Sequence, residues 1–471
     1  MTVELRRYGP KPGIGIVHLG LGAFFRAHGA VYVGEAVARS GGDWGIVGIS
    51  LQTAGTRDNL MPQDCVYTAL ELGPHGRVPR VITSLVGVLV APEDPEAVLA
   101  QMADPAVRIV TLTVTEKGYC HDPSSGALNL AHPDIVHDLA QNLPRSAPGY
   151  LVRALQRRRA AGVRPFTVLT CDNLPRNGQL VRGVVLALAR AVDPGLADWI
   201  AAEGRFPATM VDRIVPATKP EDIAALQDLT GYHDAAPVMH EPFRQWVVED
   251  DFVDGVRPDL AAVGVQMVQD VTAFEHMKLR MLNGTHSALA YLGYLAGHET
   301  IAATVGDPVF AGFVRRLWTE EIIPALTPPP GVDLDAYAAA LFNRYANPAI
   351  RHRTWQIAMD GSQKLPQRIL GTLSDNLAAG RASPGLILAV AAWMHYVGGV
   401  DENGQPIEVK DPLAARLRAL SDGAVAPADK VAALLSVREV FPAPLASALR
   451  AGLTDAYQTL ASNGARAAVA G

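Results

Sequence analysis

Four polar residues interrupt an otherwise apolar stretch in the middle of the chain. They are Glu275, Lys278, Asn283 and His286, and they lie in a segment, 275–297, whose apolar residues recur with a helical period. On a helix that advances about 100° per residue, the four side chains fall within an arc of about 140°. The spacing therefore predicts one polar face on one helix.

These residue types suit the oxidation of a secondary alcohol by hydride transfer. The reaction needs a base for the hydroxyl proton, and Lys278 is the candidate, because burial and a cationic nicotinamide ring both favour the neutral form of a lysine amine. It also needs donors for the oxygen, which gains negative charge as the proton leaves, and Asn283 offers an amide N–H. His286 would orient the lysine or bind a neighbouring hydroxyl. A structural alternative stays open, with a lysine that extends to solvent and a histidine satisfied within the core.

A glycine turn near the N-terminus predicts a dinucleotide site. The first apolar run ends in Gly20-x-Gly22, and a helical pattern and a second apolar run, 44–51, follow it. In such a strand–turn–helix–strand unit, Gly20 permits the tight bend and Gly22 allows the backbone to approach a pyrophosphate. The fingerprint is incomplete, because Phe25 stands where G-x-G-x-x-G has its third glycine and no acidic residue follows the second run.

The rest of the chain divides into a sheet-forming part and a helical part. Two further β-branched runs, 107–115 and 165–173, alternate with helical patterns, as in a doubly wound parallel sheet. From about residue 271 onward the patterns are helical. The sequence therefore predicts an α/β fold with a Rossmann-type domain over residues 1–270, followed by a mainly α-helical domain over residues 271–471.

Polar residues directly after the predicted strands are further candidates for the site, because ligands gather at the carboxyl ends of parallel strands. Thr115, Glu116 and Lys117 follow one run, and Asp172 and Asn173 follow the next. A strand-end asparagine is also a common turn former, so that alternative stays open.

Charge and cysteine content exclude several classes of protein. The formal charge of −6 disfavours nucleic-acid binding, and we expect the basic cluster RALQRRRAAG at 153–162 to be a solvated helix face. Three cysteines lie too far apart for a disulfide framework or a metal site, so we expect no metal and a reducing compartment.

The N-terminal residues lack the apolar core of a signal peptide. The longest uncharged run, 382–400, contains Pro384, His395 and a glycine pair, which predicts a buried helix starting near Pro384 rather than a membrane span. We expect a cytoplasmic protein with no membrane contact.

Eight segments, found in order over nearly the whole chain, resemble one enzyme family. They are GLGAFFRAH (20–28), PQDCVYT (62–68), TVTEKGY (113–119), CDNLPRNG (171–178), VDRIVP (211–216), EPFRQWVVEDDF (241–252), KLRMLNGTHS (278–287) and DGSQKLPQR (360–368). The chain is similar in these segments to the long-chain polyol dehydrogenases, which include mannitol 2-dehydrogenase and D-fructuronate reductase (D-mannonate oxidoreductase). The resemblance implies an N-terminal Rossmann-type domain, a helical C-terminal domain, and NAD(P) chemistry without a metal.

The resemblance also implies a role for each matching residue. Lys278 of the K-x₄-N-x₂-H motif would be the general base, and Asn283 and Asn173 would hold the reacting oxygen. The family histidine falls on His286, and Glu275 would relay protons to solvent. Asp212 and Glu116 would line the substrate site. The expected cofactor contacts are Gly20, Gly22, Phe24, Arg26 and, after the second strand, Ser50 or Thr53.

Cofactor and substrate preferences are expected from two local features. NAD-specific mannitol dehydrogenases carry an acidic residue after the second strand, and this chain lacks it; NAD is nevertheless our choice, with NADP as the alternative. A uronate needs a cation for its carboxylate, and residues 351–368 offer Arg351, Arg353, Lys364 and Arg368. Because DGSQKLPQR and 393–404 resemble fructuronate reductases, we expect Lys364 and Arg368 to bind D-mannonate or D-fructuronate, with D-mannitol and D-fructose as the alternative.

Two rival interpretations are weighed against this one. β-Hydroxyacid dehydrogenases also join a Rossmann domain to a helical one, but they place the lysine and asparagine four residues apart, whereas Lys278 and Asn283 are five apart. A nucleotide- or sugar-binding protein without turnover would tolerate loss of Lys278. The expected partner is a small sugar acid or polyol, and the expected state is a monomer or small homo-oligomer.

Overall fold

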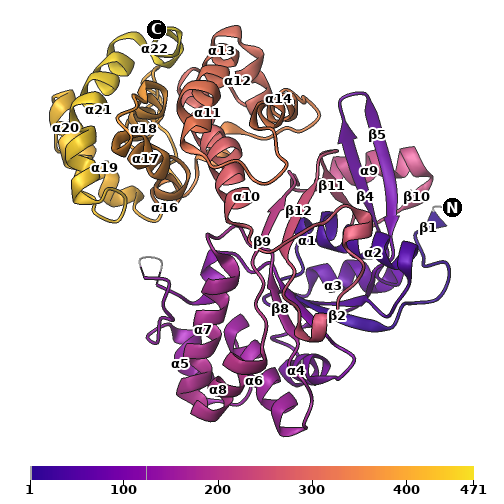
Figure 1. The fold of residues 1–471 in the computed structure, drawn as a ribbon. Coiled ribbons are helices and arrows are strands. Elements are labelled where there is room, and N and C mark those ends of the chain that lie inside the picture. The colour runs from indigo at the N-terminus through magenta and orange to yellow at the C-terminus, as the bar shows by residue number, and fades with distance from the viewer. Residues whose placement is uncertain (1–2, 123–124) are drawn as a thin grey trace. The chain divides into compact units, whose positions relative to one another are not determined.

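The computed structural model describes residues 3–122 and 125–471 of the chain. The chain forms two compact units, Met1–Thr272 and Ala273–Gly471, which Figure 1 shows in the colours of the residue numbering. Each unit has its own core and is described separately below.

Five parallel strands form the main sheet of the first unit, in the order β6-β3-β2-β7-β8. Their bounds are β2 Ile14–Leu19, β3 Gly45–Ser50, β6 Leu85–Val90, β7 Ile109–Leu112 and β8 Thr167–Thr170. Numbered along the chain, this is the 3-2-1-4-5 order of a Rossmann fold, in which ligands bind where the order reverses, beside β2 and β7. The predicted fold class is confirmed.

Adjacent residues of these strands enter different cores, because side chains alternate across a sheet. Val17 and Val110 belong to one core, whereas Ile16 and Ile109 belong to the core on the other face. The helices of the first core are α4 (Pro95–Ala103), α5 (Pro133–Ala140), α6 (Ala147–Ala160), α7 (Asn177–Val192) and α8 (Pro194–Glu203). Burial on both faces explains why the sequence shows continuous apolar runs rather than alternation.

Within the described residues, further strands form three smaller sheets, which the sequence analysis did not predict. They are β11-β4-β5 (Val238–His240, Tyr67–Gly73, Gly76–Ile82), β13-β12-β9 (Gln266–Val268, Gln245–Glu249, Thr209–Asp212) and β1-β10 (Val3–Glu4, Tyr232–His233). Apart from the seven-residue hairpin strands β4 and β5, these strands have two to five residues and carry too little local pattern to be recognised, since their pairing is decided by distant segments.

The helix predicted after the glycine turn is interrupted. It comprises α1 (Ala23–Ala27) and α2 (Gly29–Ser40), separated by His28 with φ −128° and ψ −85°. The His28 ring is buried, and its Nε2 atom lies 2.9 Å from the carbonyl oxygen of Gln245. This tertiary hydrogen bond accompanies a break that the apolar periodicity did not reveal.

The prediction of a solvated basic face on α6 is wrong for two of its arginines. Arg153 and Arg158 are buried. The Arg153 guanidinium donates to the carbonyl oxygens of Asp138 and Gln141, and that of Arg158 donates to three carbonyl oxygens, including Asp104 O at 2.7 Å. A guanidinium carries five donors, so it can satisfy the unpaired carbonyls at helix ends inside the unit.

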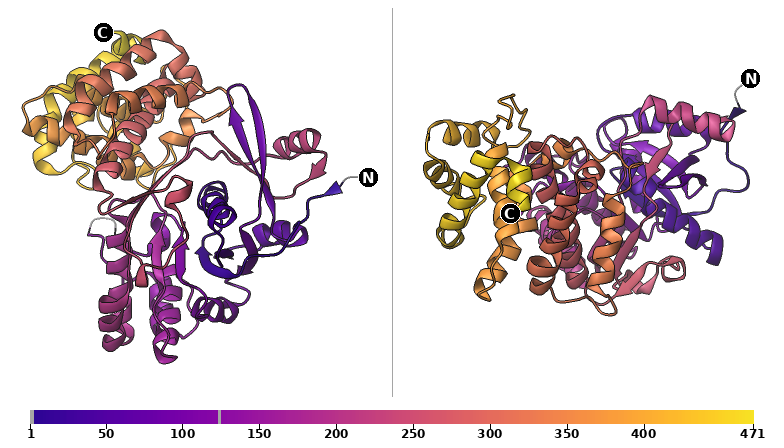
Figure 2. Two further views of the ribbon diagram at one scale, coloured as in Figure 1. Left: turned by 45° about the vertical axis from the view of Figure 1, so that its right-hand side comes forward. Right: turned by 90° about the horizontal axis from the view of Figure 1, so that it is seen from above.

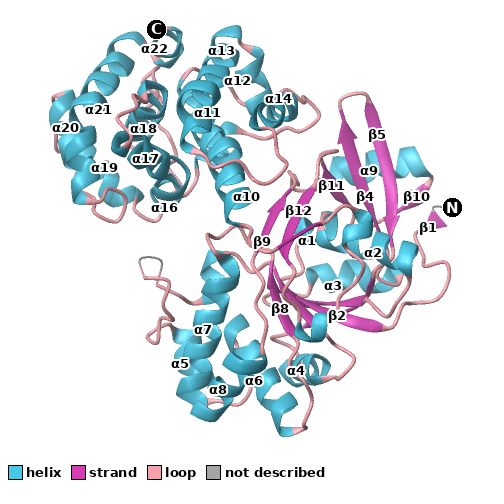
Figure 3. Cartoon of the chain, in the orientation of Figure 1, coloured by secondary structure: helices cyan, strands magenta, loops and turns pink. Residues whose placement is uncertain are grey.

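The second unit is built from helices (Figures 2 and 3). They are α10 Thr272–Met277, α11 Thr285–Leu295, α12 Ile301–Gly306, α13 Pro308–Arg316, α14 Leu334–Tyr345, α15 Thr354–Ala358, α16 Gly361–Leu365, α17 Gly371–Ala378, α18 Pro384–Tyr396, α19 Ala414–Asp422, α20 Pro427–Leu435, α21 Ala443–Asn463 and α22 Ala465–Ala470. The predicted buried helix is confirmed, since α18 packs against both α11 and α21 and its apolar residues are buried. In the described part of the chain, no helix has the length and apolarity needed to cross a membrane.

Three π-helical segments lie in this unit: η5 (Lys278–Gly284), η6 (Leu317–Ile322) and η8 (Pro366–Leu370). The assumption of a regular α-helix through 275–297 is therefore wrong over η5. In a π-helix the hydrogen bonds join residues five apart, so such residues come close in angle around the axis. Lys278 and Asn283, five apart, share a face more closely than the α-helical spacing predicted.

Side chains from elsewhere in the unit bind the backbone of η5. The Trp318 indole Nε1 donates to the carbonyl oxygen of Met281 at 3.1 Å, and the Tyr345 hydroxyl donates to that of Leu282 at 2.8 Å. A π segment disturbs the regular helical hydrogen bonds, and buried carbonyls need replacement donors. At Gly284 a Cβ atom would lie 2.6 Å from the carbonyl oxygen of Arg368 in η8, so only glycine allows this approach.

We predict that Tyr345→Phe lowers the free energy of unfolding by about 1–3 kcal/mol, because the Leu282 carbonyl loses a buried donor. Urea unfolding followed by circular dichroism measures the change. Tyr150→Phe is the matched control, since that buried hydroxyl makes only a long bond of 3.4 Å to the Ala91 carbonyl and should cost less. Equal stability of Tyr345→Phe and the wild type would contradict the inference that this hydroxyl stabilises η5.

Candidate active site

The turn after β2 has the shape that a dinucleotide requires. Gly20 has φ +89°, and a Cβ atom there would lie 2.2 Å from the carbonyl oxygen of Thr113 at the end of β7. Gly22 is exposed and precedes α1. Gly20 therefore serves as the predicted tight turn, and the exposed backbone at Gly22 fits close approach of a phosphate group.

A buried histidine supports this turn from within the sheet. The two ring nitrogens of His18 lie 2.8 Å from Thr111 Oγ1 and 2.9 Å from Thr113 Oγ1, and its ring stacks on Phe25. The Thr113 hydroxyl in turn donates to the Gly20 carbonyl at 2.9 Å. Burial lowers the pKa of His18 to about 3, so the ring is neutral. Its hydrogen bonds to the Thr111 and Thr113 hydroxyls hold the turn in place.

The other predicted cofactor residues, Phe24, Arg26 and Ser50, lie in α1 and at the end of β3. Ser50 is buried as the last residue of β3, and Phe24 is half-buried and stacks on His28. The Arg26 guanidinium donates to the Ala236 carbonyl at 2.6 Å and lies 5.3 Å from the centre of the Tyr67 ring. Arg26 thus has structural contacts within the unit, and its role toward a cofactor stays a prediction.

Asp172, which follows β8, accepts hydrogen bonds from residues that follow β7. Its carboxylate accepts the backbone N–H groups of Val114 and Thr115 at 2.9 and 3.0 Å and the Tyr119 hydroxyl at 2.7 Å. Burial raises the pKa of Asp172, against the effect of these hydrogen bonds. Thr115 has φ +63° and ψ 169°, a region that residues with a side chain rarely adopt. The bonds to Asp172 therefore accompany local strain at a strand end, next to the predicted residues Glu116 and Asn173.

The remaining candidates of the first unit differ in exposure. Asn173 is exposed after β8, Glu116 is half-buried in the turn η2 (Glu116–Tyr119), and Asp212 is buried as the last residue of β9. The neighbouring Arg213 donates to the carbonyl oxygens of Ala27 and Glu241 and so fixes the backbone after Asp212.

In the second unit, the K-x₄-N-x₂-H motif spans η5 and the first turn of α11. Lys278 is buried, Asn283 is half-buried, and His286 is buried. Glu275 is half-buried in α10. All four predicted residues therefore belong to one continuous helical segment, which consists of α10, η5 and α11 and is π-helical over η5.

His286 is not a satisfied core histidine. Its ring centre lies 4.6 Å from that of Tyr345 and 5.2 Å from that of His352. Its Nε2 atom is shielded from solvent and has no hydrogen-bond partner within the described residues. Burial first, and then the charges of His352, Arg344, Arg368 and Lys278, hold its pKa well below the ordinary value. A neutral imidazole with an unsatisfied nitrogen suits a substrate hydroxyl.

The four cations predicted between 351 and 368 separate into two groups. Arg351 is exposed, and Arg353 lies 3.5 Å from the Glu299 carboxylate. Lys364 Nζ donates to the Met359 carbonyl at 2.5 Å, and Arg368 donates to the Ser287 hydroxyl at 3.3 Å, one residue from His286. The sequence analysis missed Arg344 and His352, because nothing in their local pattern connects them with His286.

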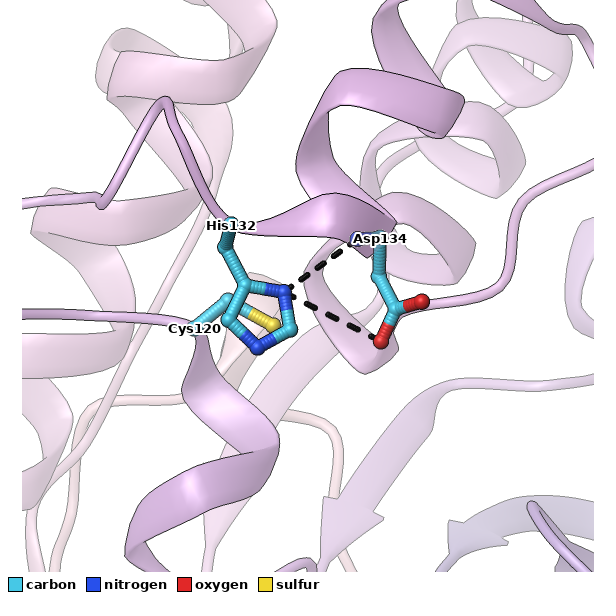
Figure 4. A group of neighbouring side chains, drawn as sticks. All are labelled: Cys120, His132 and Asp134. Atoms are coloured by element: carbon cyan, nitrogen blue, oxygen red, sulfur yellow. Dashed lines mark hydrogen bonds and ion pairs between the residues drawn. The ribbon is translucent and has the colours of Figure 1, made fainter.

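One group with metal-ligating atoms lies elsewhere in the first unit. Ligand atoms of Cys120, His132 and Asp134 are within 4.8 Å of one another (Figure 4). His132 Nδ1 accepts the backbone N–H of Asp134 at 3.2 Å and thereby caps α5 (Pro133–Ala140). Burial, and then the Asp134 and Asp138 carboxylates, raise the pKa of the Cys120 thiol to about 12. His132 is therefore the N-cap residue of α5.

Comparison with known proteins places both units in one family. The family model described as the mannitol dehydrogenase Rossmann domain matches residues 14–262, and that described as the mannitol dehydrogenase C-terminal domain matches residues 270–461. The chain is 48% identical to a D-mannonate oxidoreductase of Escherichia coli (strain K12), covering 97% of this chain and 95% of that protein. It is 42% identical to a mannitol 2-dehydrogenase of Phaeosphaeria nodorum, covering 99% and 82%.

A solved structure extends the likeness to three dimensions. The Pseudomonas fluorescens mannitol 2-dehydrogenase, in a ternary complex with NAD and D-mannitol, matches with a TM-score of 0.89 and 40% sequence identity, over 99% of this chain and 96% of that one. The chain therefore belongs to the mannitol dehydrogenase family and is an oxidoreductase that acts on CH–OH groups.

Proposed function

We propose that the protein interconverts D-mannonate and D-fructuronate with NAD, and that Lys278 is the general base. The observation that carries the proposal is the placement of a buried lysine at the start of η5, with Asn283 and the unsatisfied nitrogen of His286 in the same helical segment. Burial favours the neutral amine of a lysine, which is the form that accepts a proton.

The first unit is proposed to bind the cofactor, and bound NAD supplies the hydride acceptor. The Gly20 turn and Ser50 would contact the dinucleotide. NAD is preferred over NADP because Arg57, in the helix that follows β3 (α3, Gly55–Leu60), is ion-paired with both Asp58 and Glu93. A guanidinium engaged by two carboxylates is a poor partner for the 2′-phosphate of NADP.

The remaining residues would act on the substrate oxygens. Amide N–H groups of Asn283 and Asn173 would stabilise the oxygen that gains charge as its proton moves to Lys278. His286 would bind a neighbouring hydroxyl through Nε2, and Glu275 would pass the proton from Lys278 to solvent. Asp212 and Glu116 would accept hydrogen bonds from other hydroxyl groups of the chain-like substrate.

The substrate is proposed to be the hexonate, with D-mannitol as the second candidate. The identity with the E. coli D-mannonate oxidoreductase and the cations Lys364 and Arg368 favour the hexonate. The likeness to the P. fluorescens mannitol 2-dehydrogenase keeps D-mannitol as the second candidate.

We predict that Lys278→Ala lowers kcat by about 10²–10⁴-fold, the usual contribution of a general base. The assay follows NADH absorbance with D-mannonate as substrate, and calorimetry should find NAD binding unchanged. Added methylamine should restore part of the rate, because it replaces the missing amine. Lys410→Ala, which removes an exposed lysine of the same unit, is the control. Near-normal turnover of Lys278→Ala would reject the base assignment.

The substrate proposal predicts a definite order in a panel of alcohols. D-mannonate should give the highest kcat/KM, above D-altronate, D-mannitol, D-sorbitol and D-arabinitol, and NAD should be used better than NADP. Initial rates of cofactor reduction measure both preferences. Oxidation of D-mannitol without oxidation of D-mannonate would make the second candidate correct.

A further inference from the structure

We infer that Asp172 is a positioning residue, which holds the backbone of Asn173 so that its amide is placed to bind the reacting oxygen; the inference rests on the proposed role of Asn173. Both residues follow β8 and belong to the segment CDNLPRNG. Asn173 is exposed, so the place of its amide depends on how firmly the backbone before it is held. Three sets of contacts, all in the first unit, hold that backbone.

The carboxylate of Asp172 joins its loop to the turn after the neighbouring strand. The strands β7 and β8 are parallel, with Leu112 opposite Thr170 at their last residues, so both turns lie at one edge of the sheet. Asp172 Oδ2 accepts the backbone N–H of Val114 at 2.9 Å, and Oδ1 accepts that of Thr115 at 3.0 Å. The Asp172 side chain therefore cannot turn without breaking two bonds to the end of β7.

A buried tyrosine supplies a third donor. The Tyr119 hydroxyl donates to Asp172 Oδ2 at 2.7 Å, and the Thr170 hydroxyl donates to the same phenol oxygen. Burial, and then the Asp172 carboxylate, raises the pKa of Tyr119 well above its ordinary value, so the phenol keeps the proton that it donates. The carboxylate thus accepts three hydrogen bonds from outside its own loop.

The carbonyl group of Asp172 is held as well. It accepts the side-chain amide N–H of Asn177 at 3.0 Å and the backbone N–H of Leu174 at 2.9 Å. Asn177 is buried, and its amide also bonds the N–H and the carbonyl of Thr209, the first residue of β9. Because the peptide bond is planar, fixing the Asp172 carbonyl also fixes the nitrogen and the Cα atom of Asn173.

Backbone strain at the other end of these bonds favours a functional role. Thr115 has φ +63° and ψ 169°. A residue with a side chain keeps such a conformation only where its surroundings impose it, and strained residues gather at functional sites. The bond from the Thr115 N–H to Asp172 is one such constraint, and it connects the turn that carries Glu116 with the loop that carries Asn173.

An amide cannot replace this carboxylate. A carboxylate accepts at both oxygens, whereas an asparagine side chain has one acceptor oxygen and an NH₂ donor group. If the amide oxygen of Asp172→Asn keeps the bonds to Val114 and Tyr119, its NH₂ group faces the N–H of Thr115 and that link is lost. The size of the side chain is unchanged, so the variant tests the hydrogen bonds rather than the packing.

The test is a double-mutant cycle of Asp172→Asn and Asn173→Ala, with saturating NAD and the alcohol that the wild type oxidises best. Asn173→Ala should lower kcat about 10²-fold, the usual effect of losing one donor to the developing oxyanion. Asp172→Asn should lower kcat about 10- to 100-fold, as misplacement of a reactive group does, with KM little changed. When residue 173 is already alanine, Asp172→Asn should cost less than about threefold, because it acts through that amide.

Asp138→Asn is the matched control. The buried Asp138 carboxylate in α5 accepts the backbone N–H groups of Arg145 and Ser146 at 2.7 and 3.0 Å and the Ser146 hydroxyl at 2.5 Å. It therefore has the same kinds of donors as Asp172, and Asp138→Asn should lower stability in urea by a similar amount while leaving kcat unchanged. Tyr119→Phe, which removes one donor and keeps the ring, replaces Asp172→Asn in the cycle if that variant does not fold.

The outcomes separate the positioning role from the proposed function. Equal losses of kcat from Asp172→Asn in both backgrounds would overturn the positioning role, as would a similar loss of kcat in Asp138→Asn. Weaker NAD binding by Asp172→Asn in calorimetry would also overturn it, because the variant would then act on the cofactor. If Asn173→Ala alone keeps normal turnover, the proposed role of Asn173 fails, and the inference fails with it.

Discussion

The arrangement of the proposed catalytic residues Lys278 and Asn283 depends on one irregular helical segment, η5, whose backbone is held by tertiary hydrogen bonds. In η5 the hydrogen bonds join residues five apart, which brings Lys278 and Asn283 toward a common face. Such a segment is stable only if its buried carbonyls find donors, and Trp318 and Tyr345 supply them to Met281 and Leu282. The backbone of η8 packs directly on Gly284, so the segment that carries Arg368 is positioned by the same contact. Lys278, the proposed base, and Asn283, the proposed oxygen-binding amide, are thereby connected to Arg368 within one unit.

The two units differ in the polar groups that they place at their candidate residues. At the strand ends of the first unit, the half-buried carboxylate of Asp172 accepts the backbone N–H groups of Val114 and Thr115, and Thr115 has a strained conformation beside Glu116. In the second unit, burial lowers the pKa of both His286 and His352, so both imidazoles are neutral near pH 7. The first arrangement fixes the backbone at a strand end, and the second provides neutral imidazoles that can donate or accept a hydrogen bond.

Sequence patterns recovered much of the fold and only part of the site. The runs at β2, β3, β7 and β8 were recognised because strands buried on both faces are continuously apolar. The smaller sheets, the break at His28 and the buried arginines of α6 were missed or misassigned. In each of these cases the partner is distant in sequence, as when Arg158 donates to the carbonyl of Asp104 or His28 meets that of Gln245. Local periodicity contains no information about such partners.

The sequence by itself determined the fold class, the family resemblance and the residue types of the reaction, because these follow from apolar period, glycine placement and the K-x₄-N-x₂-H spacing. Only the tertiary structure decided that the spacing of five belongs to a π-helix, and that Tyr345 and His352 meet His286 from separate segments. The physical reason is that a one-dimensional pattern reports which side of a helix or strand is buried. Which distant donor satisfies a buried carbonyl, and which charges meet around one ring, is settled by packing alone.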